Sequence, residues 1–317
     1  MSARSGGCLQ PTGRPIAMGT NGAVSTPHYL ASAAGFHTLR AGGSAVDACI
    51  AANATLCVTL NHMAGLGGDL TEATKLAFAD RDRWVTDPAT IDIPYERLLS
   101  KSYAKERRQR IDMLRARPEG EIGPGVGGDT VYLAAVDRDG LACSLIQSVY
   151  FEFGSAFVPP GTGILLQNRG SFFKLDPARP NALAPRKRTF HTIIPAMALH
   201  NREPVLLFGT MGGEGQPQTQ AAILTRMVDF GFDVQEAIEA PRWLYGRTWG
   251  EKSRTLKLEG RVPDGVVAEL KRRGQDVEML EDWSQKMGHA QAIWIDRKRG
   301  TLHAGADPRG DGAALAW

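Results

Sequence analysis

The pattern of apolar and polar positions divides the chain into a helical first part and a strand-rich second part. Ser25, followed by Pro27, predicts a helix start, because serine caps helices and proline suits their first turn. The residues from Ala45 to Val58 are almost all small or apolar, which predicts a buried helix. Helices are therefore expected over 25–40, 45–58 and 72–84, with one or two more within 94–117.

Residues 118–129, PEGEIGPGVGGD, show no periodicity and consist mainly of glycine, proline and acidic residues, which marks them as a linker. From Thr130 onward the pattern becomes strand-like, and Asp139-Gly140 between two β-rich runs predicts a hairpin. Helices that flank antiparallel strands indicate a layered α+β domain. Further strands are expected over 163–166, 193–199, 205–208 and 292–295, and helices over 218–230, 234–240 and 264–273.

Composition and charge exclude several classes of protein. Lys and Arg number 37 against 34 Asp and Glu, and this net charge of +3 is too weak to indicate nucleic-acid binding. No apolar run reaches the roughly 18 residues of a membrane span, and the opening MSARSGGCLQPTGRP lacks a signal-peptide core, so a cytoplasmic protein is expected. The 4 cysteines are scattered without CxxC spacing, which predicts free thiols.

Two glycine clusters and the histidines are candidate chemical sites. Neither GLGGD at 65–69 nor GTMGGEG at 209–215 matches a nucleotide-binding pattern. The second cluster follows a predicted strand and precedes a predicted helix, so its backbone N–H groups could hold an oxyanion. The 7 histidines form neither HExxH nor H-x3-H, and no metal site is expected.

Thr130 is the third candidate, because it opens a strand directly after the glycine-rich linker. Most threonines in such a place are simply β-forming residues. If the Asp129–Thr130 bond is cut, however, Thr130 gains a free α-amine, whose reference pKa is about 7.7–8.0. Such an amine can take the hydroxyl proton while the oxygen attacks a carbonyl. The residues alone leave both interpretations open.

Long stretches of the chain resemble the γ-glutamyltransferase (γ-glutamyltranspeptidase) family of N-terminal-nucleophile hydrolases, and their details are most similar to its bacterial acylase branch. Together they cover most of the chain, and they include 22–70, EATKLAFADRDRWVTDP, GDTVYLAAVDRDGLACSLIQS, GTMGGEGQPQTQA and GADPRGDG. The resemblance implies a four-layer α-β-β-α sandwich formed as one composite domain. Residues 1–129 would be its mostly helical, large-subunit-like part, and residues 130–317 its β-rich, small-subunit-like part.

The resemblance also implies roles for particular residues. Thr130 falls at the nucleophile position, freed by self-cleavage between Asp129 and Thr130. Ser148 falls where the family has a hydroxyl that hydrogen-bonds the nucleophile, and Gly212 and Gly213 fall on the oxyanion-hole pair. The implied activity is that of an amidohydrolase or acyltransferase acting on a small amide or peptide donor. Water or an amine such as an amino acid would resolve the acyl-enzyme, without a metal or organic cofactor.

The donor pocket departs from the family pattern. Tyr150 replaces an asparagine, Arg169 a glutamate or glutamine, and the pair His191-Thr192 a pair of serines, while Phe172 lies where an aspartate is usual. Those groups normally hold the charged ends of a glutamyl donor, so losing an acid and gaining Arg169 reverses the charge complementarity. Weak use of γ-glutamyl amides, and better use of acyl groups that end in a carboxylate, is therefore expected.

A larger departure lies between residues 70 and 71, where GLGGDL runs directly into TEATKLAFADRD. In the family, a long stretch at this point completes the sheet and supplies an arginine for the donor carboxylate. Its loss is expected to leave open sheet edges and uncovered apolar surface, which favour self-association into homo-oligomers. A second interpretation stays open, namely a non-catalytic remnant that neither cleaves itself nor turns over.

Overall fold

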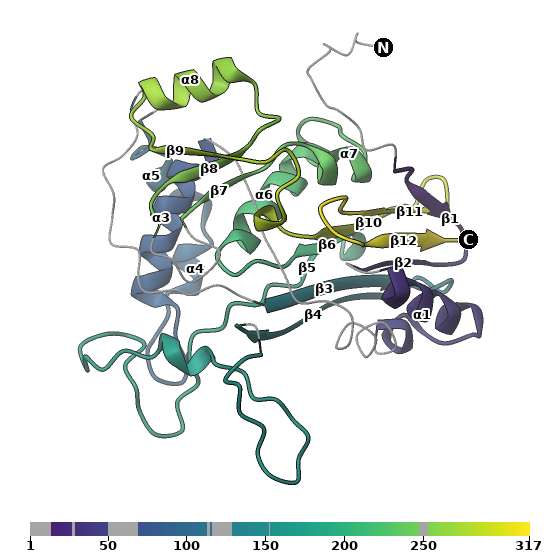
Figure 1. Ribbon diagram of the computed structural model, residues 1–317, viewed down its shortest axis with the longest axis horizontal. Helices are drawn as coiled ribbons and strands as arrows, with labels where there is room; N and C mark the ends of the chain where they lie inside the picture. The colour runs from purple at the N-terminus through teal and green to yellow at the C-terminus, as the bar shows by residue number, and fades with distance from the viewer. Residues whose placement is uncertain are drawn as a thin grey trace.

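The computed structural model describes residues 14–26, 29–49, 69–112, 115, 129–151, 153–246 and 253–317. These residues form a mixed α/β fold with a five-stranded, a four-stranded and a three-stranded sheet (Figure 1). None of the helices in this part of the chain is long and apolar enough to cross a membrane.

The helices and strands have the following bounds. The helices are α1 (Tyr29–Arg40), α3 (Asp69–Trp84), α4 (Tyr95–Leu98), α5 (Lys101–Arg108), α6 (Gly215–Val228), α7 (Val234–Glu239) and α8 (Asp264–Arg272), with 3-10 turns η1 (Arg169–Phe172) and η2 (Gln285–Met287). The five-stranded sheet has the order β1 (Ala17–Gly19), β11 (Thr301–Ala306), β10 (Ala290–Asp296), β6 (Glu203–Thr210) and β5 (Ala196–His200). The four-stranded sheet has the order β12 (Ala313–Ala316), β2 (Ala23–Thr26), β3 (Asp129–Val136) and β4 (Ala142–Tyr150). The three-stranded sheet has the order β7 (Trp243–Tyr245), β8 (Leu256–Glu259) and β9 (Val277–Leu280).

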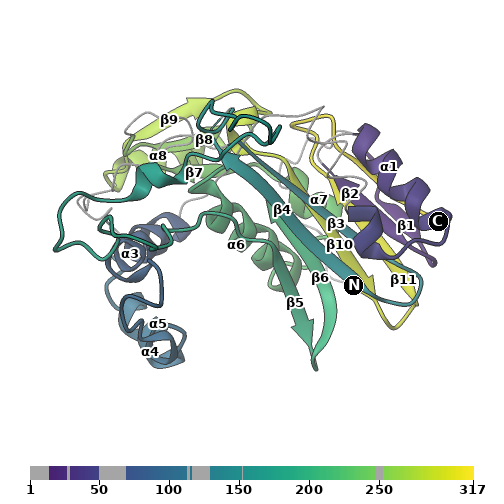
Figure 2. The same ribbon diagram turned by 90° about the horizontal axis from the view of Figure 1, so that it is seen from below.

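The two larger sheets pack face to face, and β3 lies in the middle of this packing. Tyr132 of β3 meets Leu207 of β6 in the cluster between the sheets. Because successive strand residues face opposite sides, Leu133 points the other way, toward the cluster that includes α1. On the outer face of the five-stranded sheet, Ile223 of α6 and Ile238 of α7 pack in a further cluster (Figure 2). Both faces of β3 are thus buried.

Several predicted elements are confirmed with small shifts at their ends. The hairpin is formed by β3 and β4, and Gly140 in its turn has φ +85°, a conformation that favours glycine. The helices expected over 218–230, 234–240 and 264–273 correspond to α6, α7 and α8. The helix expected over 45–58 is helical over 45–49, and its remainder lies outside the described residues, as do residues 118–128 of the expected linker.

Other local predictions were wrong. Ser25 does not cap a helix: it lies buried in β2, where its hydroxyl donates a hydrogen bond to the carbonyl of Gly305 at 2.8 Å, and α1 begins only at Tyr29. Residues 163–166 form no strand: Gly163 adopts φ +64°, although the backbone of Leu166 exchanges hydrogen bonds with Ser155 and Phe157. The first part of the chain is also less uniformly helical than expected, since β2 inserts between β12 and β3.

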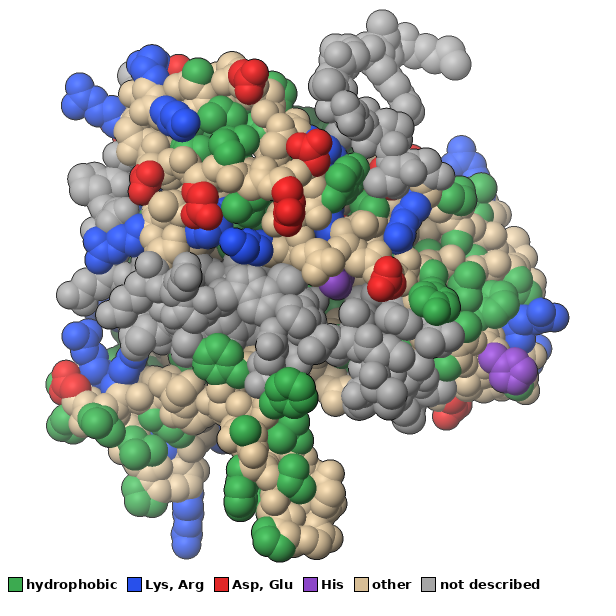
Figure 3. Space-filling view, viewed as in Figure 1, with side chains coloured by type: hydrophobic (Ala, Val, Ile, Leu, Met, Phe, Trp, Pro, Cys, Tyr) green, Lys and Arg blue, Asp and Glu red, His purple; other side chains and the backbone are tan. Residues whose placement is uncertain are grey.

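Within the described residues, the two larger sheets end on the same side at β4 and β5. Ser144 of β4 donates a hydrogen bond to the carbonyl of Ala196 in β5 at 2.9 Å, so the two end strands lie close together. Met197 and Leu199 of β5 are exposed. Further exposed apolar side chains gather on the protruding loops after β4, visible in Figure 3.

A buried cluster of charged side chains joins the three-stranded sheet to the end of β11. The Arg309 guanidinium donates to both oxygens of Glu259, at 2.6 and 2.7 Å, and to Asp307 at 3.1 Å. Arg242 pairs with Asp307, and Arg261 pairs with Glu259 at 2.8 Å. The carboxylates of Glu259 and Asp307 are completely buried, so each depends on these arginines for compensation.

His289 lies beside this cluster, and we expect it to make stability depend on pH. Burial lowers its pKa from 6.5 to about 4; the charge of Asp307 opposes this shift, and that of Arg242 acts in the same direction as burial. As the pH falls, the unfolded chain therefore takes up this proton before the folded chain does. The stabilisation by neutral His289 is complete above pH 6.5 and is lost progressively as the pH falls toward 4, by about 3 kcal/mol in total.

Urea unfolding between pH 7 and 4 checks this expectation. Other groups titrate in the same range, so wild type is compared with His289→Gln, which cannot take up the proton. The variant should lose less stability over this interval. Equal losses for the two proteins would contradict the prediction.

Candidate active site

Thr130 lies at the start of β3, opposite Ser148 of β4. The Thr130 hydroxyl donates a hydrogen bond to the Ser148 hydroxyl, with an Oγ1–Oγ distance of 2.8 Å. The side chain of Thr130 is buried, with the residue only 2% exposed. In this uncut chain the Thr130 nitrogen is an amide, so its own amine is not yet available as a base.

The pairing of β3 with β4 becomes irregular at the bond between Asp129 and Thr130. Thr130 pairs with Ser148 but Asp129 pairs with Tyr150, so that Val149 is the extra residue of a bulge opposite this bond. Tyr150 adopts φ +80°, which is rare for a residue with a bulky side chain. The Tyr150 N–H donates to Ser148 Oγ at 3.0 Å. The predicted cleavage bond is thus the point at which a regular ladder breaks.

Gly212 and Gly213 form the turn between β6 and α6. Their φ angles of +116° and +51° favour glycine. Their carbonyls accept hydrogen bonds from Gly215 and Gln216, at 2.8 and 3.2 Å, whereas no described residue accepts one from their own N–H groups. Adjacent free N–H groups of this kind can hold an anion.

The glycine turn lies near the end of the stacked sheets that carries Thr130. Gly209, close to the end of β6, packs so tightly on Tyr132 of β3 that an added Cβ would come within 2.3 Å of the ring. Tyr132 is only two residues beyond Thr130 in the same strand. The close contact therefore brings the strand that leads into the turn over the beginning of β3.

Arg169 lies in η1 and is buried beside Ser148, with 2% of its surface exposed. Its Nη1 donates to the Ser148 carbonyl and its Nε donates to Thr192 Oγ1, each at 3.1 Å. Its Nη2 is buried and has no hydrogen-bond partner among the described residues, and none of their carboxylates forms an ion pair with Arg169. Burial lowers the pKa of Arg169, opposed by Tyr150, whose ring centre lies 5.6 Å from the guanidinium carbon.

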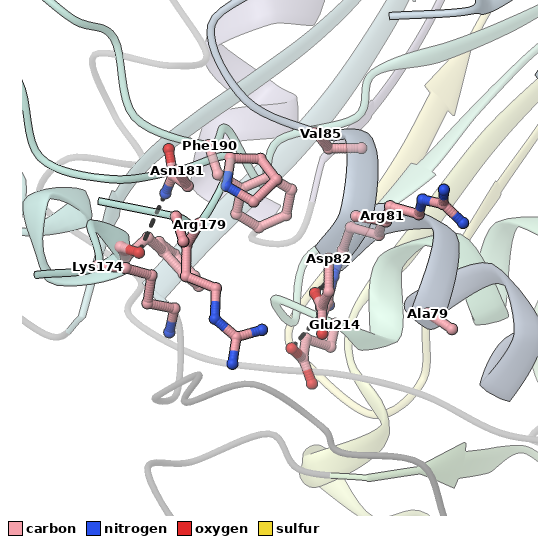
Figure 4. Close-up of a pocket in the computed structure, with 13 residues that line it drawn as sticks. Ala79, Arg81, Asp82, Val85, Lys174, Arg179, Asn181, Phe190 and Glu214 are labelled. Atoms are coloured by element: carbon pink, nitrogen blue, oxygen red, sulfur yellow. Dashed lines mark hydrogen bonds and ion pairs between the residues drawn. The ribbon is translucent and has the colours of Figure 1, made fainter. Parts of the chain in front are cut away.

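Two cavities lie next to these residues. One of about 450 Å³ is lined by His191, Thr192 and Gly213, together with residues of α3 and α6. The pKa of His191 is lowered by partial burial and by the charge of Arg169. The other cavity, of about 580 Å³, includes Phe172 and extends toward Lys174 and Arg179 (Figure 4).

The structure brings most of the predicted residues together, but not all of them reach a cavity. Ser148, Arg169 and Thr192 form one hydrogen-bonded chain that begins at Thr130. Thr130 lines neither cavity, and Asp129 is described only through its backbone. The described residues contain no group of three side chains suited to holding a metal ion.

Sequence reasoning missed an ion pair between Arg81 of α3 and Glu214, which directly follows Gly213. Arg81 Nη1 lies 2.8 Å from Glu214 Oε1, and both side chains line both cavities. The sequence did hold a signal, because Arg81 lies in EATKLAFADRDRWVTDP and Glu214 in GTMGGEG, two of the stretches that carry the family resemblance.

Comparison with known proteins gives one family. The family model described as Gamma-glutamyltranspeptidase matches residues 31–71 and 69–317, and the two matches meet where the sequence places the missing stretch. Over 246 residues the chain is 55% identical to the glutathione hydrolase-like YwrD proenzyme of Bacillus subtilis (strain 168), covering 78% of this chain and 46% of the relative. Over 249 residues it is 49% identical to the oxamate amidohydrolase proenzyme of Klebsiella pneumoniae, with the same shares of 78% and 46%.

A solved structure is similar as well. The cephalosporin acylase from Bacillus halodurans matches with a TM-score of 0.68 and 42% identity, covering 78% of this chain and 44% of that one. The chain spans about half the length of the curated relatives it matches, 46% in both cases above.

Proposed function

This chain belongs to the gamma-glutamyltranspeptidase family, and we propose that it is an N-terminal threonine amidohydrolase or acyltransferase. Its donors would be γ-glutamyl amides of the glutathione type or related acyl amides that carry a carboxylate. The observation that carries the proposal is the 2.8 Å hydrogen bond between Thr130 Oγ1 and Ser148 Oγ at the start of β3. The proposal includes the four-layer α-β-β-α arrangement, with residues 1–129 and 130–317 as two parts of one composite domain.

Self-cleavage is the first step that we propose. Thr130 Oγ1 attacks the carbonyl carbon of Asp129, the peptide C–N bond breaks, and the acyl group moves from nitrogen to oxygen. Water then hydrolyses this ester, which leaves a carboxylate on Asp129 and a free amine on Thr130. Ser148 orients the attacking hydroxyl, and the bulge at this bond supports the site of cleavage. Two fragments that meet at Asp129/Thr130, measured as intact masses, are the expected result.

Turnover then uses the new amine. The Thr130 amine takes the hydroxyl proton as Oγ1 attacks the donor carbonyl, and the proton passes to the departing amine when the C–N bond breaks. The free N–H groups of Gly212 and Gly213 would stabilise the oxyanion by on the order of 3 kcal/mol per donor. Water gives hydrolysis of the acyl-enzyme, and an amine gives transfer.

Arg169 supports a donor that carries a carboxylate. Among the described residues this buried cation has no counter-ion, which is costly, and a bound carboxylate would offset that cost. Oxamate, named for the Klebsiella relative, is an amide with a carboxylate and no ammonium group. Because Thr130 and Arg169 are both almost inaccessible in the uncut chain, the proposal requires self-cleavage to open the way to them.

Donor preference provides the kinetic test. The cut protein should have a higher kcat/KM for a glutaryl anilide than for a γ-glutamyl anilide, because Arg169 repels the ammonium group of the latter. Arg169→Met should lower kcat/KM for the glutaryl compound by roughly 10- to 100-fold, the value of a charged hydrogen bond. A butanoyl anilide, which lacks the carboxylate, is the control and should be affected much less. Strong preference for the glutamyl compound, or equal losses for glutaryl and butanoyl donors, would contradict the donor assignment.

A further inference from the structure

Arg81 connects the helix α3 to the turn that holds Gly212 and Gly213. Its guanidinium pairs with Glu214, the residue that follows Gly213 and precedes α6. The two side chains are largely buried, with exposed fractions of 15% for Arg81 and 9% for Glu214. Figure 4 shows the labelled residues Asp82 and Glu214 on one wall of the larger cavity, with Lys174 and Arg179 on the wall opposite.

Several contacts hold the Arg81 guanidinium in place. Its Nε donates to Asp82 at 2.7 Å, and its central carbon lies 4.5 Å from the ring centre of Phe78 and 5.6 Å from that of Phe190. Glu214 is held through its backbone as well, since its carbonyl accepts a hydrogen bond from Gln218 at 3.0 Å. The ion pair therefore fixes one end of the glycine turn to a helix that precedes Thr130 in the sequence.

The charge of Glu214 matters because it lies directly beside the glycine turn. A largely buried carboxylate there would oppose negative charge developing on an oxyanion, since charges interact more strongly away from water. The positive charge of Arg81, which also pairs with Asp82 at 2.7 Å, offsets part of this effect.

We propose that Arg81 is a positioning residue for the oxyanion turn, which it holds in place through Glu214 while offsetting part of the charge of that carboxylate. The inference rests on the proposed function, because only that function makes the turn an oxyanion-binding site. Arg81 precedes the Asp129–Thr130 bond and Glu214 follows it, so after cleavage one fragment would complete the site of the other through this pair.

Kinetics of four variants test the charge argument. Arg81→Met should lower kcat by roughly 10- to 100-fold with little change in KM, because Glu214, beside the glycine turn, then loses the positive charge of Arg81. Arg81→Lys keeps the charge and should restore most of the rate. The double variant with Arg81→Met and Glu214→Gln should be faster than Arg81→Met alone, because the opposing charge is also gone. Arg97→Met removes an exposed arginine from an ion pair with Glu106 on the same fragment, and should leave kcat unchanged.

Hydrogen–deuterium exchange tests the positioning role without relying on activity. It is measured in a Thr130→Ala background, so that the result does not depend on cleavage. Arg81→Met should increase exchange in a peptide covering residues 209–218, whereas Arg97→Met should not. Unchanged exchange in this peptide, or a double variant as slow as Arg81→Met, would overturn the proposal. A wild-type protein without turnover would instead overturn the proposed function, and the exchange data would still decide whether Arg81 holds the turn.

Discussion

Thr130→Ala should yield a single uncut chain of 34.3 kDa without measurable turnover. The substitution removes the hydroxyl that attacks the Asp129 carbonyl, and without cleavage no free amine forms at residue 130. Loss of a nucleophile typically lowers kcat by on the order of 10⁴-fold or more. Intact mass spectrometry of the purified protein reports cleavage, and release of aniline from a glutaryl anilide reports turnover.

Two further variants distinguish chemistry from misfolding. Thr130→Ser retains a hydroxyl and should still be cut, although more slowly, because the unbranched side chain is less restricted at χ1. Ser148→Ala removes the acceptor of the 2.8 Å hydrogen bond and should slow cleavage without abolishing it. If Thr130→Ala is still cut at the same bond, a foreign protease is responsible and self-cleavage fails. A wild-type chain that stays whole would favour the non-catalytic remnant.

Glu259→Gln should destabilise the folded protein by about 3–5 kcal/mol, the cost of breaking a buried ion pair. Glu259 is completely buried and accepts hydrogen bonds from Arg309 and Arg261. In the variant, Asp307 would remain to compensate Arg309 and Arg242, whereas Arg261 would lose its ion pair with Glu259. The buried excess of positive charge therefore rises while the shape of the side chain barely changes.

Urea unfolding at pH 7 measures this loss. Glu106→Gln is the matched control, because Glu106 faces Arg97 and Arg110 at 3.5 Å on the exposed surface. Such exposed pairs contribute about 0–1 kcal/mol, so the control should unfold almost like wild type. A loss of stability for Glu259→Gln no larger than for Glu106→Gln would show that the buried cluster is not needed for stability.

Local sequence patterns predicted those elements whose structure depends on nearby residues. The β3–β4 hairpin follows from Asp139-Gly140, since glycine adopts the required positive φ with little cost. The strand–turn–helix around Gly212 and Gly213 was likewise visible as apolar runs on either side of glycines. Ser25 shows the limit of such reasoning: its local pattern predicts a helix cap, but β3 and β12 are available as partners and it becomes part of a strand.

The candidate site also combines features set by short segments of sequence with features set by tertiary packing. The sequence by itself determined the family resemblance, the position of Thr130 at the start of a strand, and the glycine turn, because strand alternation and turn conformation are properties of short segments. Only the tertiary structure decided that Arg169 is buried without an ion pair to any carboxylate of the described residues, and that Arg81 meets Glu214, 133 residues away. Burial and charge pairing arise from packing between distant segments, so a spacing along the chain does not specify which charges lose water and which find a partner.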